Sequence, residues 1–95
     1  MRDYELAFII SPTLDDEGAT NIVDRVSGMV KSINGEVASV DVWGRRTLAY
    51  PINKHREGIY VLLSAKMSPE GLGQLERDLK LTEEVIRYML LKLDN

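Results

Sequence analysis

The stretch WGRRTLAYPINKHREG, from Trp43 to Gly58, gathers the side chains of this chain that are best suited to binding phosphate. Its formally charged cations are Arg45, Arg46, Lys54 and Arg56. Residues 41–66 hold five Lys or Arg against two acids, so this part carries +3 in a chain whose net charge is −3. Guanidinium groups match phosphate with two parallel hydrogen bonds. Solubilisation and protection of an edge strand explain the same residues equally well.

The indole of Trp43 offers a second kind of chemistry in this stretch. An indole can stack on a nucleic-acid base. A tryptophan beside a glycine such as Gly44 is more typical of packing at a β-bulge, which we favour. A bulge here would also decide whether Arg45 or Arg46 faces a bound nucleic acid, and the sequence leaves that register open.

Catalysis and metal binding have little support in the sequence. The single histidine, His55, falls in an expected loop, and the chain has no cysteine. The acids Asp15, Asp16 and Glu17 lack the spacing of a metal-binding loop and favour the positively charged start of a helix. No glycine motif that cradles phosphate is present. We therefore expect no enzyme activity, no catalytic or metal-ligating residue, no cofactor and no small-molecule substrate.

Length and composition predict one small domain, residues 1–95. Of its residues, 44% are hydrophobic and 28% charged, which is ordinary for a globular protein. No apolar run approaches the roughly 20 residues that a membrane span requires, and the first residues do not resemble a signal peptide. The absence of cysteine fits a reducing compartment, so we expect a cytoplasmic protein without a membrane partner. The acidic net charge indicates that any nucleic-acid surface is local or shared with a more basic partner.

The elements that must position these residues follow from periodicity. Residues 4–10, 36–52 and 59–67 are typical of strands, with the polar segment 53–58 joining the last two. Apolar spacing of three and four predicts a helix from Asp15 that stops at Asn34-Gly35, with Gly28 weakening its interior by ~1 kcal/mol. A second helix is expected with Ser68 as its cap and Pro69 in its first turn. Residues 85–93 read as a last strand. Pro51 places its strand at the rim of the sheet.

This order predicts an α+β, ferredoxin-like split βαβ sandwich, βαββαβ. Right-handed crossovers place both helices on one face of a four-stranded antiparallel sheet. The other face is then bare.

Alternation along the strands predicts which residues line the bare face. Leu6, Phe8 and Ile10 would point inward on the first strand, Val61, Leu63 and Ala65 on the third, and Ile86, Tyr88 and Leu90 on the last. The residues between them would point outward, and their apolar members suggest an interaction site, although single exposed apolar residues are also normal. The expected partner-binding residues are Tyr60, Leu62, Met89 and Leu91.

Several motifs together resemble one family. MRDYE at residues 1–5, WGRRTLAYPINK at 43–54, GIY at 58–60, and Arg87 and Lys92 near the end are similar to bacterial small-subunit ribosomal protein six. The resemblance implies the same βαββαβ fold and a structural role in the small ribosomal subunit. It also implies binding to small-subunit ribosomal RNA together with a basic neighbour, ribosomal protein eighteen. The RNA-binding residues implied by matching positions are Arg2, Arg46, Lys54, Arg87 and Lys92.

Two other classes of protein share this type of fold. A free-standing RNA-recognition module normally presents several aromatic side chains on its central strands, and here only Tyr60 is expected to face outward there. A small-molecule regulatory domain would use a helix start or a dimer interface, and the segments SPTLDD and SPEGLG show no more than ordinary capping residues.

Overall fold

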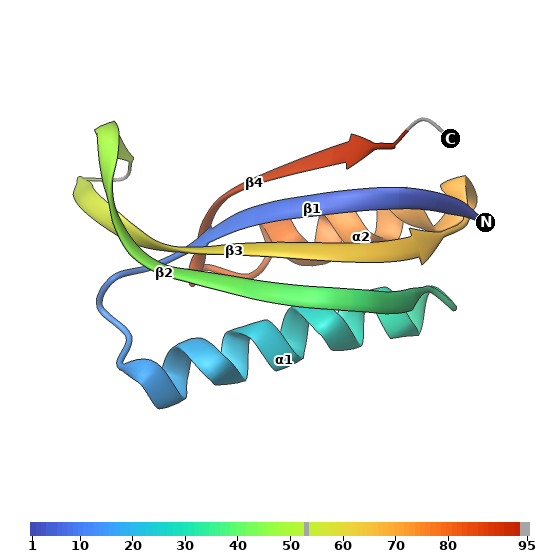
Figure 1. Cartoon of the computed structure of the whole chain (residues 1–95), viewed down its shortest axis with the longest axis horizontal. Helices are drawn as coiled ribbons and strands as arrows, with labels where there is room; N and C mark the ends of the chain where they lie inside the picture. The colour runs from blue at the N-terminus through green and yellow to red at the C-terminus, as the bar shows by residue number, and fades with distance from the viewer. Residues whose placement is uncertain (53, 94–95) are drawn as a thin grey trace.

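The computed structural model describes residues 1–52 and 54–93, which fold as a four-stranded sheet with two α-helices on one face (Figure 1). The elements are β1 (Arg2–Ile10), α1 (Asp16–Ser32), β2 (Glu36–Ile52), β3 (His55–Met67), a 3-10 turn (Pro69–Gly71), α2 (Leu72–Lys80) and β4 (Val85–Lys92). The strand order is β2-β3-β1-β4, and all three strand pairs are antiparallel. The predicted ferredoxin-like βαββαβ fold is confirmed, and Pro51 lies on an edge strand, as expected.

The core lies between the sheet and the helices. Leu6, Phe8 and Ile10 of β1 are at most 1% exposed, and Val61 and Leu63 of β3 are at most 3% exposed. The helices add Val26, Val30, Leu75 and Leu79, all buried. The inward and outward assignment of β1 and β3 is therefore confirmed, since the period of two along a strand decides which side chains are removed from water.

Helix α1 begins and ends where its sequence indicates. The Asp15 carboxylate accepts a hydrogen bond from the backbone N–H of Gly18 at 2.8 Å, which satisfies one of the free donors of the first turn. Beyond the last turn Asn34 adopts a positive φ of 64°. A Cβ on Gly35 would lie 2.9 Å from Met67 Cγ, so the glycine lets the chain pass close to the end of β3.

The start of the second helix differs from the expectation. The Ser68 side chain makes no capping hydrogen bond, and the residues after it form a 3-10 turn before α2 begins at Leu72. Ser68 therefore occupies the expected cap position, but its side chain does not cap, and the α-helix itself begins later than expected. Pro69 does occupy the first position of the turn, where its missing N–H costs nothing.

The β2–β3 hairpin is longer than the sequence indicated. Strand β3 begins at His55, so the described residues 55–58 of the expected loop are strand, and His55 is not a loop residue. Lys54 occupies the turn with a positive φ of 68°. Figure 1 shows the far end of this hairpin bending away from α1.

Strand β4 exists as expected, but its first residues are shifted by a bulge. Ile10 of β1 pairs with Val85, and Ile9 pairs with Arg87, which leaves Ile86 without a partner. Val85 packs against the core in its place, and Ile86 Cδ1 lies 3.7 Å from the position of a Cβ on Gly58. The inward assignment of Ile86 was therefore wrong, because a single extra residue reverses the alternation. Tyr88 and Leu90 pack against the core, as predicted.

Candidate functional site

The helix-free face of the sheet carries a regular array of outward side chains. Ala7 of β1 lies between Leu62 of β3 and Met89 of β4 in the strand register, and Ile9 lies between Tyr60 and Arg87. Met89 is 50% exposed and Leu91 48% exposed, although both are large and apolar. The outward positions predicted for Tyr60, Leu62, Met89 and Leu91 agree with this register. We call this surface the open face.

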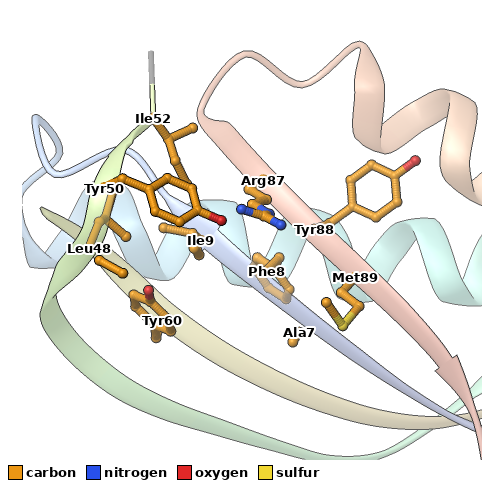
Figure 2. Close-up of a pocket in the computed structure, with 11 residues that line it drawn as sticks. Ala7, Phe8, Ile9, Leu48, Tyr50, Ile52, Tyr60, Arg87, Tyr88 and Met89 are labelled. Carbon is orange, nitrogen blue, oxygen red and sulfur yellow. The ribbon is translucent and has the colours of Figure 1, made fainter. Parts of the chain in front are cut away.

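One end of the open face is hollowed by the β2–β3 hairpin. Beyond Gly44 the hairpin overhangs the sheet and encloses about 300 Å³ against β1 and β4. Leu48 fixes the overhang, being only 8% exposed. Figure 2 shows the lining side chains, which include Ile9, Tyr50, Ile52, Tyr60, Arg87 and Met89. We call this space the hairpin hollow.

Two polar groups in the hairpin hollow are without partners. Within residues 1–52 and 54–93, neither the Arg87 guanidinium nor the Tyr50 hydroxyl has a hydrogen bond or an ion pair. Figure 2 shows the Tyr50 hydroxyl directed toward Arg87, from the overhanging strand to the strand beneath it. The hollow thus combines an apolar lining with an available cation and a hydroxyl, the usual composition of a binding pocket.

The two adjacent arginines of the opening stretch have different roles. Arg45 points to the helix side, where its Nη1 donates to the carbonyl of Pro12 and its Nη2 to that of Leu14, both at 2.8 Å. It therefore ties the segment before α1 to β2. Arg46 pairs with Gly58 in the register and shares the outward side of Tyr60; its Nη1 donates only to the Arg45 carbonyl, at 3.1 Å. The register that the sequence left open thus turns Arg46, and not Arg45, toward the open face.

Trp43 lies at the bulge that sets this register. Val42 pairs with Val61 and Gly44 with Tyr60, so Trp43 is the extra residue. Its indole is 49% exposed, and its Nε1–H donates to Asp41 Oδ2 at 3.0 Å. The bulge was predicted, but packing of the indole was not confirmed, since about half of it remains in water.

The sequence-predicted RNA-binding residues fall into two groups. Arg46, Lys54 and Arg87 lie toward the hairpin end of the sheet. Arg2 pairs with Met67 and Lys92 with Tyr4, which places both at the opposite end and on the helix side of the strands. The structure therefore brings together the hairpin group and, separately, the terminal pair, but not all five residues.

The surroundings of Tyr88 alter its titration. Burial, the hydrogen bond that its hydroxyl donates to Glu76 at 3.1 Å, and the charge of that carboxylate raise the pKa of Tyr88 above its usual value. This hydrogen bond joins β4 to α2 on the helix side, so its role is structural, although Tyr88 also contributes to the lining of the hairpin hollow.

No cluster of potential metal ligands occurs within residues 1–52 and 54–93. Over the same ranges, no helix has the length and apolar character to cross a membrane.

Sequence reasoning identified the open face but missed the hairpin hollow. Tyr50, Ile52 and Leu48 were not among the expected site residues, because the alternation of a strand gives no information on how far a long hairpin curves over its own sheet. The available signal was the apolar run from Leu48 to Ile52, which includes Tyr50, because an apolar segment in a cationic hairpin favours packing against another surface.

Comparisons with known proteins agree with one another. A family model described as ribosomal protein S6 matches residues 3–92. The small ribosomal subunit protein bS6 of Clostridium novyi is 44% identical over 90 residues, covering 95% of each chain. That of Moorella thermoacetica is 40% identical over 94 residues, covering 99% of this chain and 96% of the relative.

Solved structures give the same result. The crystal structure of 30S ribosomal protein S6 from Thermotoga maritima superposes with a TM-score of 0.92 at 32% identity, covering 97% of this chain and 87% of that one. The C-terminal domain of the MgtC protein of Mycobacterium tuberculosis has a TM-score of 0.67 at 14% identity, over 100% of this chain and 90% of that one. The second likeness concerns the fold alone.

Proposed function

The chain belongs to the ribosomal protein S6 family, and from this premise we propose that it binds small-subunit ribosomal RNA jointly with ribosomal protein eighteen. Membership makes it a structural protein of the small ribosomal subunit in the cytoplasm, and not an enzyme. We also propose that residues 1–95 act as one domain in this role.

The observation that carries the proposal is the combination of a bare apolar sheet face with cations at its hairpin end. Met89 and Leu91 remain about half exposed on a face that no helix covers. Apolar surface of this kind favours contact with another protein. The proposed partner-binding residues are Tyr60, Leu62, Met89 and Leu91.

The cations supply the RNA part of the proposal. Phosphate contacts contribute most of the salt-dependent affinity of RNA-binding proteins. The proposed RNA-binding residues are Arg2, Arg46, Lys54, Arg87 and Lys92. A net charge of −3 is unfavourable for binding RNA alone, so a basic partner is expected to neutralise most of the phosphates.

The test is the affinity of the chain for a small-subunit ribosomal RNA fragment across a salt series, with and without ribosomal protein eighteen. We expect tight binding only when the neighbour is present. Arg46→Gln should then lower the salt slope by about one unit, since each neutralised phosphate contributes roughly 0.7–0.9 to it. Equal binding without the neighbour would contradict joint recognition, and no binding in either case would contradict the RNA role itself.

A further inference from the structure

We propose that the hairpin hollow receives one unstacked base of single-stranded RNA, which stacks on Tyr50 and is held by the Arg87 guanidinium. This inference rests on the proposed function, because it assumes that RNA reaches this end of the open face. It adds a base-binding pocket to what would otherwise be contacts to phosphate and to protein.

The lining of the hollow fits a flat aromatic ligand. Ile9, Ile52 and Met89 give the hollow of about 300 Å³ an apolar lining, and the rings of Tyr50 and Tyr60 also line it (Figure 2). Tyr50 is 63% exposed, so one side of its ring is free to take a stacked base. Single-stranded RNA is recognised in this way, by splayed bases that stack on aromatic side chains and are hydrogen-bonded along their edges.

The polar groups of the hollow also fit a base. The free guanidinium of Arg87 can donate two parallel hydrogen bonds to a base edge or to a phosphate. The Tyr50 hydroxyl, directed toward Arg87, can donate or accept one more. A purely aliphatic side chain from a protein partner would leave the guanidinium buried without a partner, which is costly.

Charge divides the open face between the two kinds of partner. Around the hollow, Arg46, Lys54 and Arg87 make the hairpin end cationic, whereas Glu5 lies beside Leu91 at the other end. A basic protein would be repelled by the hairpin end and attracted to the end with Glu5. RNA would show the reverse preference, so the hollow belongs to RNA and the flat half, around Leu62 and Leu91, to the basic neighbour. Of the proposed partner-binding residues, Tyr60 and Met89 line the hollow and would therefore contact RNA in this arrangement.

The first test uses the wild-type chain with methyl-labelled Ala, Ile, Leu and Met, titrated with a single-stranded RNA tetranucleotide and followed by NMR. We expect shifts at the methyl groups of Ala7, Ile9 and Met89 and little change at Leu91. The absence of shifts in the hollow, at millimolar RNA, would overturn the inference whether or not the chain assembles with ribosomal protein eighteen.

The second test uses variants in the complex with ribosomal protein eighteen and the ribosomal RNA fragment. Tyr50→Leu removes the ring but keeps an apolar side chain, and should weaken RNA binding by roughly 5- to 150-fold, the range for loss of one stacked base. Tyr50→Phe should retain most of the affinity. Arg87→Lys keeps the charge but not the paired donors, and should weaken RNA binding several-fold. The matched control is Trp43→Leu, which removes an exposed ring outside the hollow and should change little.

The affinity of each variant for ribosomal protein eighteen in the absence of RNA separates the failure of the base pocket from the failure of the proposed function. Unchanged affinity for that protein in Tyr50→Leu, with weaker RNA binding, supports a base in the hollow. Weaker affinity for the protein with unchanged RNA binding would assign the hollow to the protein and overturn the inference, while the proposed function stands. If the complex does not form at all but the tetranucleotide shifts the hollow, the proposed function fails and the base pocket stands.

Discussion

The two faces of the sheet are built from the same strands but serve different purposes. On β3, Leu63 is fully buried beneath the helices, and Leu62, one residue earlier, lies half-buried on the open face. On β1, Phe8 is buried between Ala7 and Ile9, which face outward. Each strand therefore contributes alternate residues to stability and to binding, and a substitution can change one with little effect on the other.

The adjacent leucines of β3 give the largest expected contrast. Leu63→Ala removes a fully buried side chain and should lower the free energy of unfolding by about 2–5 kcal/mol. Leu62→Ala should cost less than about 1 kcal/mol, because part of its side chain is already in water. Urea denaturation of both variants measures the difference. We expect the main effect of Leu62→Ala to be weaker binding of ribosomal protein eighteen. Equal losses of stability in the two variants would contradict this and show that the open face is part of the core.

Gly58 tests the packing of the open face at the hairpin hollow. A Cβ at this position would overlap Ile9 Cγ2, so the glycine makes room for a side chain that lines the hairpin hollow. Gly58→Ala should destabilise the protein by roughly 1–3 kcal/mol, the usual cost of overpacking. Ile9→Ala removes Cγ2, so Gly58→Ala should cost less in an Ile9→Ala background than in the wild type, and thermal melts of the single and double variants would measure this recovery. No recovery would argue against contact with Ile9 as the cause.

Gly28 lies on the outer side of α1, and in contrast to Gly58 it has room for a side chain. A Cβ there would meet no atom within 4 Å, and the residue lies inside a helix. Gly28→Ala should therefore raise the free energy of unfolding by about 0.5–1 kcal/mol, because glycine is the costlier helix residue. RNA and partner binding should be unchanged. A stabilisation accompanied by weaker binding would contradict the separation of the faces.

Tyr88 makes a smaller, pH-dependent contribution on the helix side. Its pKa is raised in the folded chain, mainly by burial and further by Glu76, so above a pH of about 10 the folded state holds a proton that the unfolded state has released. Stability should be full below that pH and fall as the pH rises through the folded pKa. Tyr88→Phe should show a shallower alkaline decline in urea denaturation, with Tyr50→Phe as the control. Parallel declines in Tyr88→Phe and the wild type would falsify this account.

The parts of the fold that depend on local pattern could be predicted from the sequence. Alternation in β1 and β3 gave the buried and outward residues, and the acids at Asp15 and Asp16 marked the start of α1. Ile86 was misplaced because its bulge depends on how β4 meets β1, which no local pattern of β4 contains. Ser68 was misjudged for a similar reason, since a 3-10 turn starting at Pro69 replaces the expected first helical turn.

The candidate site was predicted less completely than the fold. The outward residues of β3 and β4 follow from alternation, and the family resemblance supplied the cations. The hairpin hollow depends on curvature accumulated over the 17 residues of β2, with register shifts at two bulges and again near the turn. Only the folded hairpin brings Tyr50 over Arg87, and neither residue is near the other in sequence.

The strand order has a consequence for how this protein is made. The central strand β1 is synthesised first, but its neighbour β4 is the last strand, and Tyr4 pairs with Lys92. Until β4 emerges, one side of β1 keeps its backbone groups exposed, and an unpaired strand of this kind invites pairing with other chains. The β2–β3 hairpin can form early because its pairings are local, whereas closure by β4 must bridge nearly the whole described chain. Completion of the sheet, and with it the open face, therefore requires β4, so that binding of a partner at Met89 and Leu91 reports that this strand has joined β1.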